Sequence, residues 1–158
     1  MSKSKPITNA EFLQMTRCLV GLPISRPWQG YGTAFFAEVG PLTHTYKRTE
    51  HAKADLGLDF GYGWRVEGQR SILFGSFSGR QKIHNGIESL TSLKIIDITV
   101  SGRLPELCVQ LSDGRWVHSF ATSEGQPEWS VFLNDSSWLT VKRGRVRKMS
   151  QRDYDRVA

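Results

Sequence analysis

Histidine, serine and aspartate lie close together in the segment SDGRWVHSFATSEGQPEWSVFL, which runs from Ser112 to Leu133. Asp113, His118 and Ser119 are the residue types of a nucleophilic triad, in which the histidine accepts the proton of the serine hydroxyl. The segment has no nucleophile-elbow motif, and Ser119 directly follows His118. Because adjacent side chains of a strand point to opposite faces, we do not expect these two groups to converge.

Two histidines followed by hydroxyl residues suggest a second chemistry. Two-histidine phosphoesterases pass protons between imidazoles while hydroxyl groups hold the phosphate. In His44-Thr45 and His118-Ser119 each hydroxyl residue directly follows its histidine, so on a strand the two side chains would again point apart. The other two histidines lie in polar stretches without a partner at metal-ligand spacing: His51 and His84. The sequence therefore predicts a non-catalytic protein with no metal or other cofactor.

The positive charge of the chain is concentrated at its ends. The net charge is +6, and residues 142–158 carry seven Lys or Arg against two Asp, whereas residues 6–141 carry 12 Lys or Arg against 13 Asp or Glu. We expect residues 142–158 to form a basic tail. A nucleic-acid-binding module using this tail is an alternative function. The residues that would contact nucleic acid are Lys142, Arg143, Arg145, Arg147 and Lys148.

The two cysteines and the length of the apolar segments indicate the cellular location of the protein. Cys18 and Cys108 both have apolar neighbours and lack metal-ligand spacing, so we expect two buried free thiols. No stretch approaches the roughly 18 apolar residues that a membrane-spanning helix needs, and no apolar segment follows the first residues as in a signal peptide. The expected location is the cytoplasm, with no membrane partner.

The hydrophobic periodicity predicts a single α+β domain, predominantly of antiparallel strands, over residues 1–158. Thr8 and Glu11 have the spacing of a capping box, which predicts an N-terminal helix over 6–21. Alternating apolar residues predict strands in a first β half, 31–80, and in a second β half, 83–141. The SDG sequence and residues 134–136 are predicted hairpin turns.

The second half of the chain is similar in pattern to the first. Four pairs of segments can be overlaid: Leu19 and Leu22 with Leu90 and Leu93, AFFAEVG (34–40) with ELCVQLS (106–112), THTY (43–46) with VHSF (117–120), and GWRVEGQRSIL (63–73) with EWSVFLNDSSWL (128–139). We interpret this as an internal duplication of a β-meander, in which His44 and His118 would be equivalent. Two such meanders would bury their apolar faces against each other.

Five tryptophans are many for a chain of 158 residues. Most should line the core, and Trp28 and Trp116 are the two expected to be exposed. Aromatic and arginine side chains surrounded by polar groups are typical anchors of protein interfaces. The predicted contacts to a partner protein are therefore Trp28, Arg115, Trp116, Glu124 and Glu128.

Several of these segments carry a family resemblance. The stretch Trp64 to Glu67 (WRVE), the stretch Ile72 to Ser76 (ILFGS), LSDG and GQPEWSVFL together resemble a loose group of small bacterial proteins of unknown function. The resemblance covers roughly residues 60–142, and some members of the group are similar to immunity proteins of toxin systems. It implies a cytoplasmic protein that binds and inhibits another protein. A pocket between the two halves, for a small ligand or an enzyme reaction, is a second alternative, and open sheet edges make a homodimer plausible.

Overall fold

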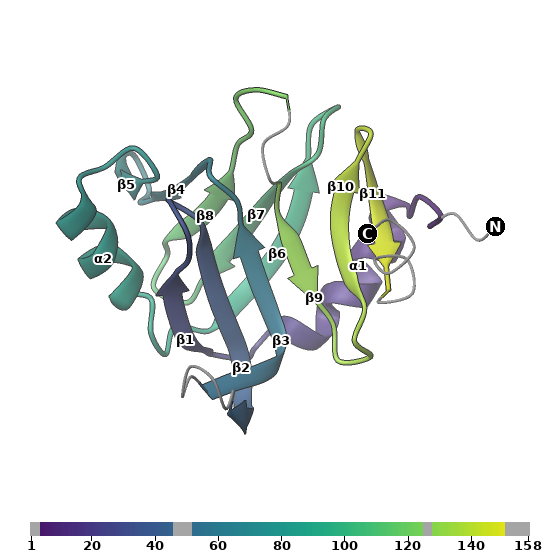
Figure 1. Cartoon of the computed structure of the whole chain (residues 1–158), viewed down its shortest axis with the longest axis horizontal. Helices are drawn as coiled ribbons and strands as arrows, with labels where there is room; N and C mark the ends of the chain where they lie inside the picture. The colour runs from purple at the N-terminus through teal and green to yellow at the C-terminus, as the bar shows by residue number, and fades with distance from the viewer. Residues whose placement is uncertain (1–3, 46–51, 125–127, 151–158) are drawn as a thin grey trace.

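Two antiparallel sheets, one of six strands and one of five, face each other across an apolar core in the computed structural model of the chain (Figure 1). The structure describes residues 4–45, 52–124 and 128–150. Two short helices complete the fold. The prediction of a single α+β domain dominated by antiparallel strands is confirmed.

Each half of the chain begins with a helix that is followed by five strands. The first half contains α1 (Asn9–Thr16), the 3-10 helix η1 (Arg17–Leu19), β1 (Ile24–Gln29), β2 (Phe35–Thr45), β3 (Ala52–Phe60), β4 (Trp64–Glu67) and β5 (Ile72–Gly75). The second half contains α2 (Arg80–Glu88), β6 (Ile95–Ser101), β7 (Glu106–Leu111), β8 (Trp116–Ser119), β9 (Ser130–Phe132) and β10 (Trp138–Lys142), and it is extended by β11 (Arg145–Met149).

The strand order shows that the two halves exchange hairpins. The six-stranded sheet has the order β1-β2-β3-β9-β10-β11, and the five-stranded sheet has the order β5-β4-β8-β7-β6. Each half therefore contributes three consecutive strands to one sheet, and its next two strands cross to the other sheet. The crossing strands β9 and β4 pair with β3 and β8, respectively, so each half closes the sheet begun by the other.

The junction between the halves shows that they are structurally equivalent. The Leu22 and Leu93 carbonyls accept hydrogen bonds from the Ile95 and Ile24 amides, respectively, in a reciprocal pair. Gly21 and Ser92 occupy matching positions before these bonds, and both have a positive φ, of 89° and 72°. The predicted repeat is thus present as two topologically equivalent units.

Part of the predicted overlay is wrong. His44 lies near the end of β2, whereas His118 lies on β8, between Cys108 of β7 and Arg65 of β4. The position of β3 that has the same pairing, between Phe36 of β2 and Ser130 of β9, is Asp59. His44 and His118 are therefore not equivalent. The predicted first β half, 31–80, starts too late, because it leaves out β1, whereas the predicted second β half, 83–141, begins within α2 and contains β6 to β9 and most of β10.

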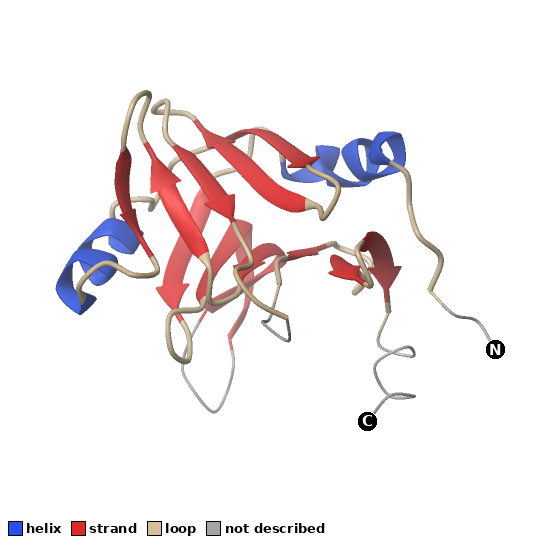
Figure 2. Cartoon of the chain, turned by 90° about the horizontal axis from the view of Figure 1, so that it is seen from above, coloured by secondary structure: helices blue, strands red, loops and turns tan. Residues whose placement is uncertain are grey.

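The helices close the open sides between the two sheets. Helix α2 contacts β1 and β5, which are edge strands of different sheets, and α1 contacts the edge strand β6. Each helix buries a short apolar stripe, with Phe12 on α1 and Ile83 and Ile87 on α2. Figure 2 shows the two helices at opposite ends of the sheets. No helix in the described ranges is long and apolar enough to cross a membrane.

The N-terminal helix is shorter than the predicted 6–21. The capping box is present: Thr8 accepts a hydrogen bond from the Glu11 amide at 3.1 Å, and the Glu11 carboxylate accepts one from the Thr8 amide at 3.0 Å. The α-helix ends at Thr16 and continues as one 3-10 turn, because the backbone reverses at Gly21 to pair with Ile95.

The prediction of a basic tail over 142–158 is wrong for its first part. Strands β10 and β11 form a hairpin in which Lys142 pairs with Arg145 and Val141 with Val146, and Val146 is buried in the core. Because this hairpin completes the edge of the six-stranded sheet, its basic residues belong to the folded body. Residues 151–158 lie outside the described residues.

Candidate functional site

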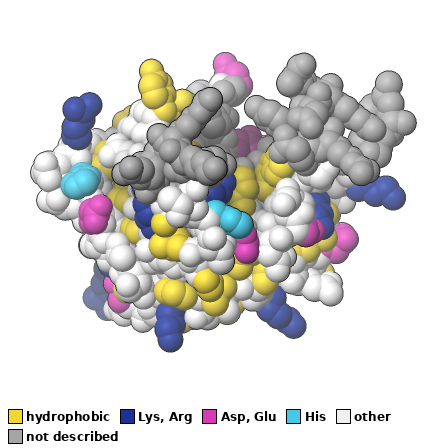
Figure 3. Space-filling view, turned by 60° about the horizontal axis from the view of Figure 1, so that its bottom comes forward, with side chains coloured by type: hydrophobic (Ala, Val, Ile, Leu, Met, Phe, Trp, Pro, Cys, Tyr) yellow, Lys and Arg dark blue, Asp and Glu magenta, His cyan; other side chains and the backbone are white. Residues whose placement is uncertain are grey.

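The outer face of the six-stranded sheet carries aromatic side chains in adjacent strands. In β2, Phe35 and Ala37 point into the core, so strand alternation places Phe36 and Glu38 on the opposite face. Trp28 of β1 pairs with Phe36, and their rings stack with centroids 4.2 Å apart and an interplanar angle of 12°. Figure 3 turns the bottom of the molecule forward and shows hydrophobic side chains gathered between charged ones.

Asp59 lies in the middle of this face. Its neighbours on the adjacent strands are Phe36 and Ser130. Burial among these groups raises the pKa of Asp59 from 3.8 to about 7. Within the part of the chain that the structure describes, its carboxylate has no hydrogen-bond or ion-pair partner. A half-buried carboxylate without a partner is costly to keep charged.

Gly57 lies on the same face of β3 as Asp59 and is closely packed, because a Cβ atom there would lie 3.2 Å from the Ala37 carbonyl oxygen. A Cβ atom at Gly57 would lie 3.8 Å from the Glu38 Oε2 atom and 3.6 Å from the Phe132 Cδ2 atom. The Glu38 carboxylate and the Phe132 ring therefore lean over Gly57 from opposite sides. We call the surface formed by Trp28, Phe36, Glu38, Asp59 and Phe132 the aromatic–acidic face.

Glu38 differs from Asp59 because it has partners. It is 8% exposed and accepts a hydrogen bond from the Ala54 amide at 3.1 Å. Burial raises the pKa of Glu38, while the Ala54 amide and the charges of Lys53 and Arg26 act to lower it. The Trp28 indole N–H is buried without a hydrogen bond of normal geometry, although its proximity to Glu38 also acts to lower that pKa. The Arg26 guanidinium lies 5.6 Å from the centroid of the Trp28 ring.

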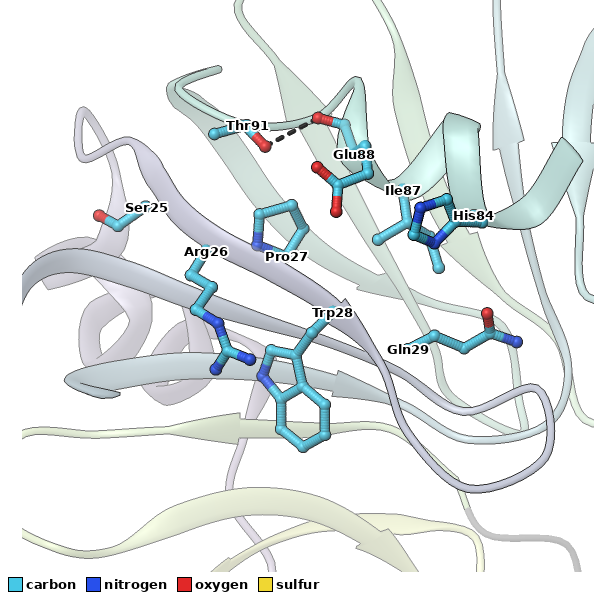
Figure 4. A pocket seen from close by; sticks show the side chains of 9 residues that line it. All are labelled: Ser25, Arg26, Pro27, Trp28, Gln29, His84, Ile87, Glu88 and Thr91. Carbon is cyan, nitrogen blue, oxygen red and sulfur yellow. Dashed lines mark hydrogen bonds between the residues drawn. The ribbon is translucent and has the colours of Figure 1, made fainter. Parts of the chain in front are cut away.

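A groove of about 550 Å³ separates β1 from α2 (Figure 4). His84 and Glu88 of α2 line it from one side, and Arg26, Trp28 and Gln29 of β1 line it from the other. The groove lies between elements of the two halves, which is where the sequence predicts a pocket if the protein takes a small ligand. It opens beside the aromatic–acidic face, because Trp28 belongs to both.

The outer face of the five-stranded sheet is polar. Arg65 Nε lies 2.6 Å from Glu67 Oε2, and His118 and Cys108 are cross-strand neighbours. Burial and the nearby Glu67 carboxylate raise the pKa of the Cys108 thiol to about 11, so little thiolate is present at neutral pH. His118 Nδ1 lies 2.6 Å from the Ser119 carbonyl oxygen.

The triad residues do not converge. Ser119 is buried on the core side of β8, where its hydroxyl donates to Glu106 Oε2 at 2.5 Å. His118 lies on the opposite face, as strand alternation predicted. Asp113 lies in the β7–β8 turn and binds Arg115 at 2.7 Å. No group of three or more His, Cys, Asp or Glu that could hold a metal ion occurs among the described residues.

The predicted partner contacts do not form one surface. Trp28 lies on the six-stranded sheet, whereas Trp116 lies on the outer face of the five-stranded sheet. Arg115 is held in a turn by Asp113 and by two hydrogen bonds to Ser89, at 2.8 and 3.0 Å. The two glutamates are exposed in the segment between β8 and β9: Glu124 and Glu128. The five predicted contacts therefore do not lie on one face, and of these residues Trp28 is the one that belongs to the aromatic–acidic face.

Sequence reasoning missed the other residues of this face: Phe36, Glu38, Asp59 and Phe132. The alternation within each strand was a usable signal. Phe36 and Asp59 each lie between two core residues of their strand, so their side chains are expected on the outer face of the sheet. The alternation did not show which strands would lie side by side. Trp64 and Trp129 are buried as expected, but the prediction that Trp28 and Trp116 are exposed is wrong, because both are half-buried, as is Trp138.

The predicted nucleic-acid contacts lie on the β10–β11 hairpin. Lys142 and Arg145 are directly opposite each other, and Arg143 adopts a positive φ of 53° in the turn. Two of the five are engaged within the protein: Arg147 donates to the Ser4 carbonyl, and Lys148 lies 3.0 Å from Asp135.

One cysteine prediction is wrong. Cys18 is exposed, because it lies on the outward side of the 3-10 turn, and its thiol donates to the Met15 carbonyl at 3.4 Å. Cys108 is half-buried. Both thiols are free, as the sequence predicted.

The fold and the site define the class of the protein: a two-sheet α+β protein made of two equivalent units, with an aromatic–acidic face on the larger sheet. Comparisons with family models, with curated proteins and with solved structures gave no match.

Proposed function

We propose that the protein acts without catalysis by binding another protein through the aromatic–acidic face. The observation that supports this most directly is the Trp28–Phe36 stack beside the partly exposed Phe132 ring. Helices α1 and α2 contact strands at the sides of the sheets. Large aromatic side chains surrounded by polar groups supply much of the binding energy at protein interfaces.

The resemblance to small bacterial proteins, some of them immunity-like, supports an inhibitory role. In this proposal the partner is a toxin or another enzyme whose surface the protein occludes. Immunity proteins that bind nucleases commonly imitate the negative charge of nucleic acid. Residues 6–141 are nearly neutral and the β10–β11 hairpin is basic, so a partner other than a basic nuclease fits better.

The test is capture of the partner from host lysate with three forms of the full-length protein. The wild-type chain and the Trp116→Ala variant should capture the same partner in stoichiometric amounts, after nuclease treatment and at high salt. The double variant Trp28→Ala, Phe132→Ala should lose at least about tenfold in affinity, because it removes two anchors of one face. Trp116 serves as the matched control, since it is a half-buried tryptophan on the opposite sheet.

Folding of each variant is checked by circular dichroism and urea unfolding before capture. Equal capture by the folded double variant and by wild type would show that the interface lies elsewhere. Loss with Trp116→Ala alone would move the interface to the five-stranded sheet.

Nucleic-acid binding is a second candidate, supported by the like charges of Lys142 and Arg145 at directly opposite positions of β10 and β11. Like charges in this arrangement destabilise a hairpin, and a bound phosphate would relieve the repulsion. Fluorescence anisotropy with a single-stranded oligonucleotide should then show affinity that falls steeply with salt. The Lys142→Glu, Arg145→Glu variant should abolish it. Salt-independent or absent binding would exclude this candidate.

A further inference from the structure

Strand β1 lies at the edge of the six-stranded sheet, so one side of its backbone faces away from the other strands. In an antiparallel pair, residues that bond to the partner strand alternate with residues whose peptide groups point away from it. The Gly30 amide donates to the Ala34 carbonyl at 2.7 Å, across the turn between β1 and β2. The same phase directs the peptide groups of Trp28 towards β2, opposite Phe36. The amides and carbonyls at positions 27 and 29 therefore point outward.

The outward peptide groups of Pro27 and Gln29 have no partner within the part of the chain that the structure describes. At the start of β1, the outward groups are satisfied by the segment after α2. The Ile24 amide donates to the Leu93 carbonyl at 2.8 Å, and the Ser92 amide donates to the Ile24 carbonyl at 2.8 Å. Further along the strand, the groove separates β1 from α2. The Gln29 amide and the carbonyls of Pro27 and Gln29 thus remain for a ligand, since proline has no amide hydrogen.

The groove follows the edge of β1, because residues of both strand faces line it. Pro27 pairs with Ala37, which is a core residue of β2. Trp28 pairs with Phe36 on the outer face, and both Pro27 and Trp28 line the groove. Its volume of about 550 Å³ is within the range of ligand sites in proteins. Extended peptides add as a further strand to exposed sheet edges of this kind.

The charges around the groove indicate which segment fits. Glu88 is exposed on α2, and its carboxylate has no hydrogen bond or ion pair among the described residues. The cation on the opposite wall is engaged, because the Arg26 guanidinium donates to the Ala52 carbonyl at 3.4 Å and lies 5.6 Å from the Trp28 ring centroid. Figure 4 shows the Glu88 carboxylate directed towards Pro27. A cationic side chain opposite Pro27 would therefore have Glu88 as its counter-ion.

We propose that the groove between β1 and α2 binds an extended segment of the partner protein, which adds to β1 as an antiparallel strand and places a lysine or arginine beside Glu88. This inference rests on the proposed function, because it names the part of the partner that binds next to the aromatic–acidic face.

The antiparallel arrangement defines the role of three consecutive residues of the segment. The first bonds to Gln29 through its own amide and carbonyl. The third is the cationic residue, and its amide donates to the Pro27 carbonyl. The residue between them lies opposite Trp28, with its amide directed away from β1 and its side chain on the outer face of the sheet.

The experiment titrates the full-length protein, labelled with ¹⁵N, with the peptide acetyl-Ser-Thr-Val-Lys-Thr-amide. Its central threonine, valine and lysine are designed to lie opposite Gln29, Trp28 and Pro27. We expect a saturable downfield shift of the Gln29 backbone amide signal and slower hydrogen exchange of that amide. A peptide with glutamate in place of the lysine should bind at least about tenfold more weakly.

Methylation of single peptide amides tests the strand pairing. N-methylation of the lysine removes the donor to the Pro27 carbonyl and should weaken binding at least about tenfold. N-methylation of the valine is the matched control, because this amide points away from β1, and it should change the affinity by less than about threefold.

Two variants at Gln29 test the edge of the strand from the protein side. Gln29→Pro removes the backbone donor and should abolish binding. Gln29→Ala loses the side-chain hydrogen bond to the Gly32 carbonyl but keeps the backbone amide, so it should bind as wild type does. Proline is tolerated on an edge strand where its nitrogen faces solvent, and the fold of the variant is checked by circular dichroism.

A charge exchange tests the role of Glu88. Glu88→Lys should weaken binding of the lysine peptide at least about tenfold and should strengthen binding of the glutamate peptide. Glu124→Lys, at an exposed glutamate between β8 and β9, is the control and should change neither affinity. No shift of the Gln29 amide, equal affinity for the two peptides, equal loss on methylation of either amide, or unchanged binding by folded Gln29→Pro would each overturn the inference.

The result can be separated from the test of the proposed function, because Phe132 lies outside the groove. If the lysine peptide does not bind while the Trp28→Ala, Phe132→Ala variant loses its partner, the groove site is wrong and binding through the aromatic–acidic face stands. If the peptide binds as expected while Phe132→Ala alone captures the partner as wild type does, the groove site stands and the proposed interface is wrong.

Discussion

Trp64 and Trp129 donate their indole N–H groups to the backbone carbonyls of Thr33 and Pro105, at 2.6 and 3.1 Å. Both tryptophans are at most 1% exposed, and each lies where its half of the chain crosses to the other sheet. Thr33 precedes β2 and Pro105 precedes β7, which are the corresponding central strands of the two units. In each unit, the segment that crosses to the other sheet is thus held to that unit by an equivalent hydrogen bond from an indole N–H to a backbone carbonyl.

We expect Trp64→Phe and Trp129→Phe to destabilise the protein to similar extents. Each should lower the free energy of unfolding by about 2 kcal/mol, because core volume is lost and a carbonyl loses its donor. Urea unfolding measures both effects, with Trp116→Phe as the half-buried control at under about 1 kcal/mol. A large loss for one core tryptophan and none for the other would contradict the structural equivalence of the two units.

The matched positions Gly21 and Ser92 give a reciprocal test of the repeat. Ser92 has φ 72°, a conformation that costs a non-glycine residue about 1 kcal/mol, whereas Gly21 adopts φ 89° at little cost. Ser92→Gly should therefore raise the free energy of unfolding by up to about 1 kcal/mol, and Gly21→Ala should lower it by about 1 kcal/mol. A Cβ at Gly21 meets no atom within 4 Å, so backbone strain alone causes the loss. Thermal and urea unfolding of both variants would show opposite signs, and equal signs would contradict this account.

Asp59 should make stability depend on pH. Its pKa is raised from 3.8 to about 7 in the folded state, so the folded protein binds more protons than the unfolded chain between these values. Stability from this group is therefore full below about pH 4 and is lost as the pH rises through about 7. Asp59→Asn should remove that slope and raise the free energy of unfolding at about pH 8 by about 2 kcal/mol.

The measurement for Asp59 is urea unfolding of wild type and variant across this pH range. Asp55→Asn, at an exposed residue of the same strand, is the control and should change stability by less than about 1 kcal/mol. A variant that is less stable than wild type at high pH would mean that Asp59 has a stabilising partner when ionised.

The two thiols should differ in reactivity. Cys18 is exposed, although burial of part of its thiol raises its pKa, and Cys108 is half-buried with a pKa of about 11. Because the thiolate is the reactive form, Cys18 should be alkylated by iodoacetamide at least about tenfold faster than Cys108 at about pH 8. Peptide mass spectrometry after timed alkylation measures both rates. Faster modification of Cys108 would indicate that the five-stranded sheet opens in solution.

Local patterns in the sequence determined much of the secondary structure. The Thr8 and Glu11 capping box, the turn at Asp113-Gly114 and the hairpin turn at 134–136 are all present. Alternation also predicted that most of the chain forms strands, because the side-chain period of a strand is a property of its own backbone. The repeat was detectable for the same reason, since equivalent units keep equivalent apolar positions.

Tertiary structure alone decided which strands became neighbours. The pairings of β3 with β9 and of β4 with β8 join segments far apart in the chain, and they form because each unit can cover its apolar face only with the other unit. These pairings separate Trp28 from Trp116 and place Ser130 beside Asp59 and Phe132 beside Gly57. They also bury much of the Asp59 carboxylate, which no local sequence pattern of β3 indicates. The physical reason is that burial depends on the side chains contributed by every neighbouring strand, whereas periodicity reports one strand at a time.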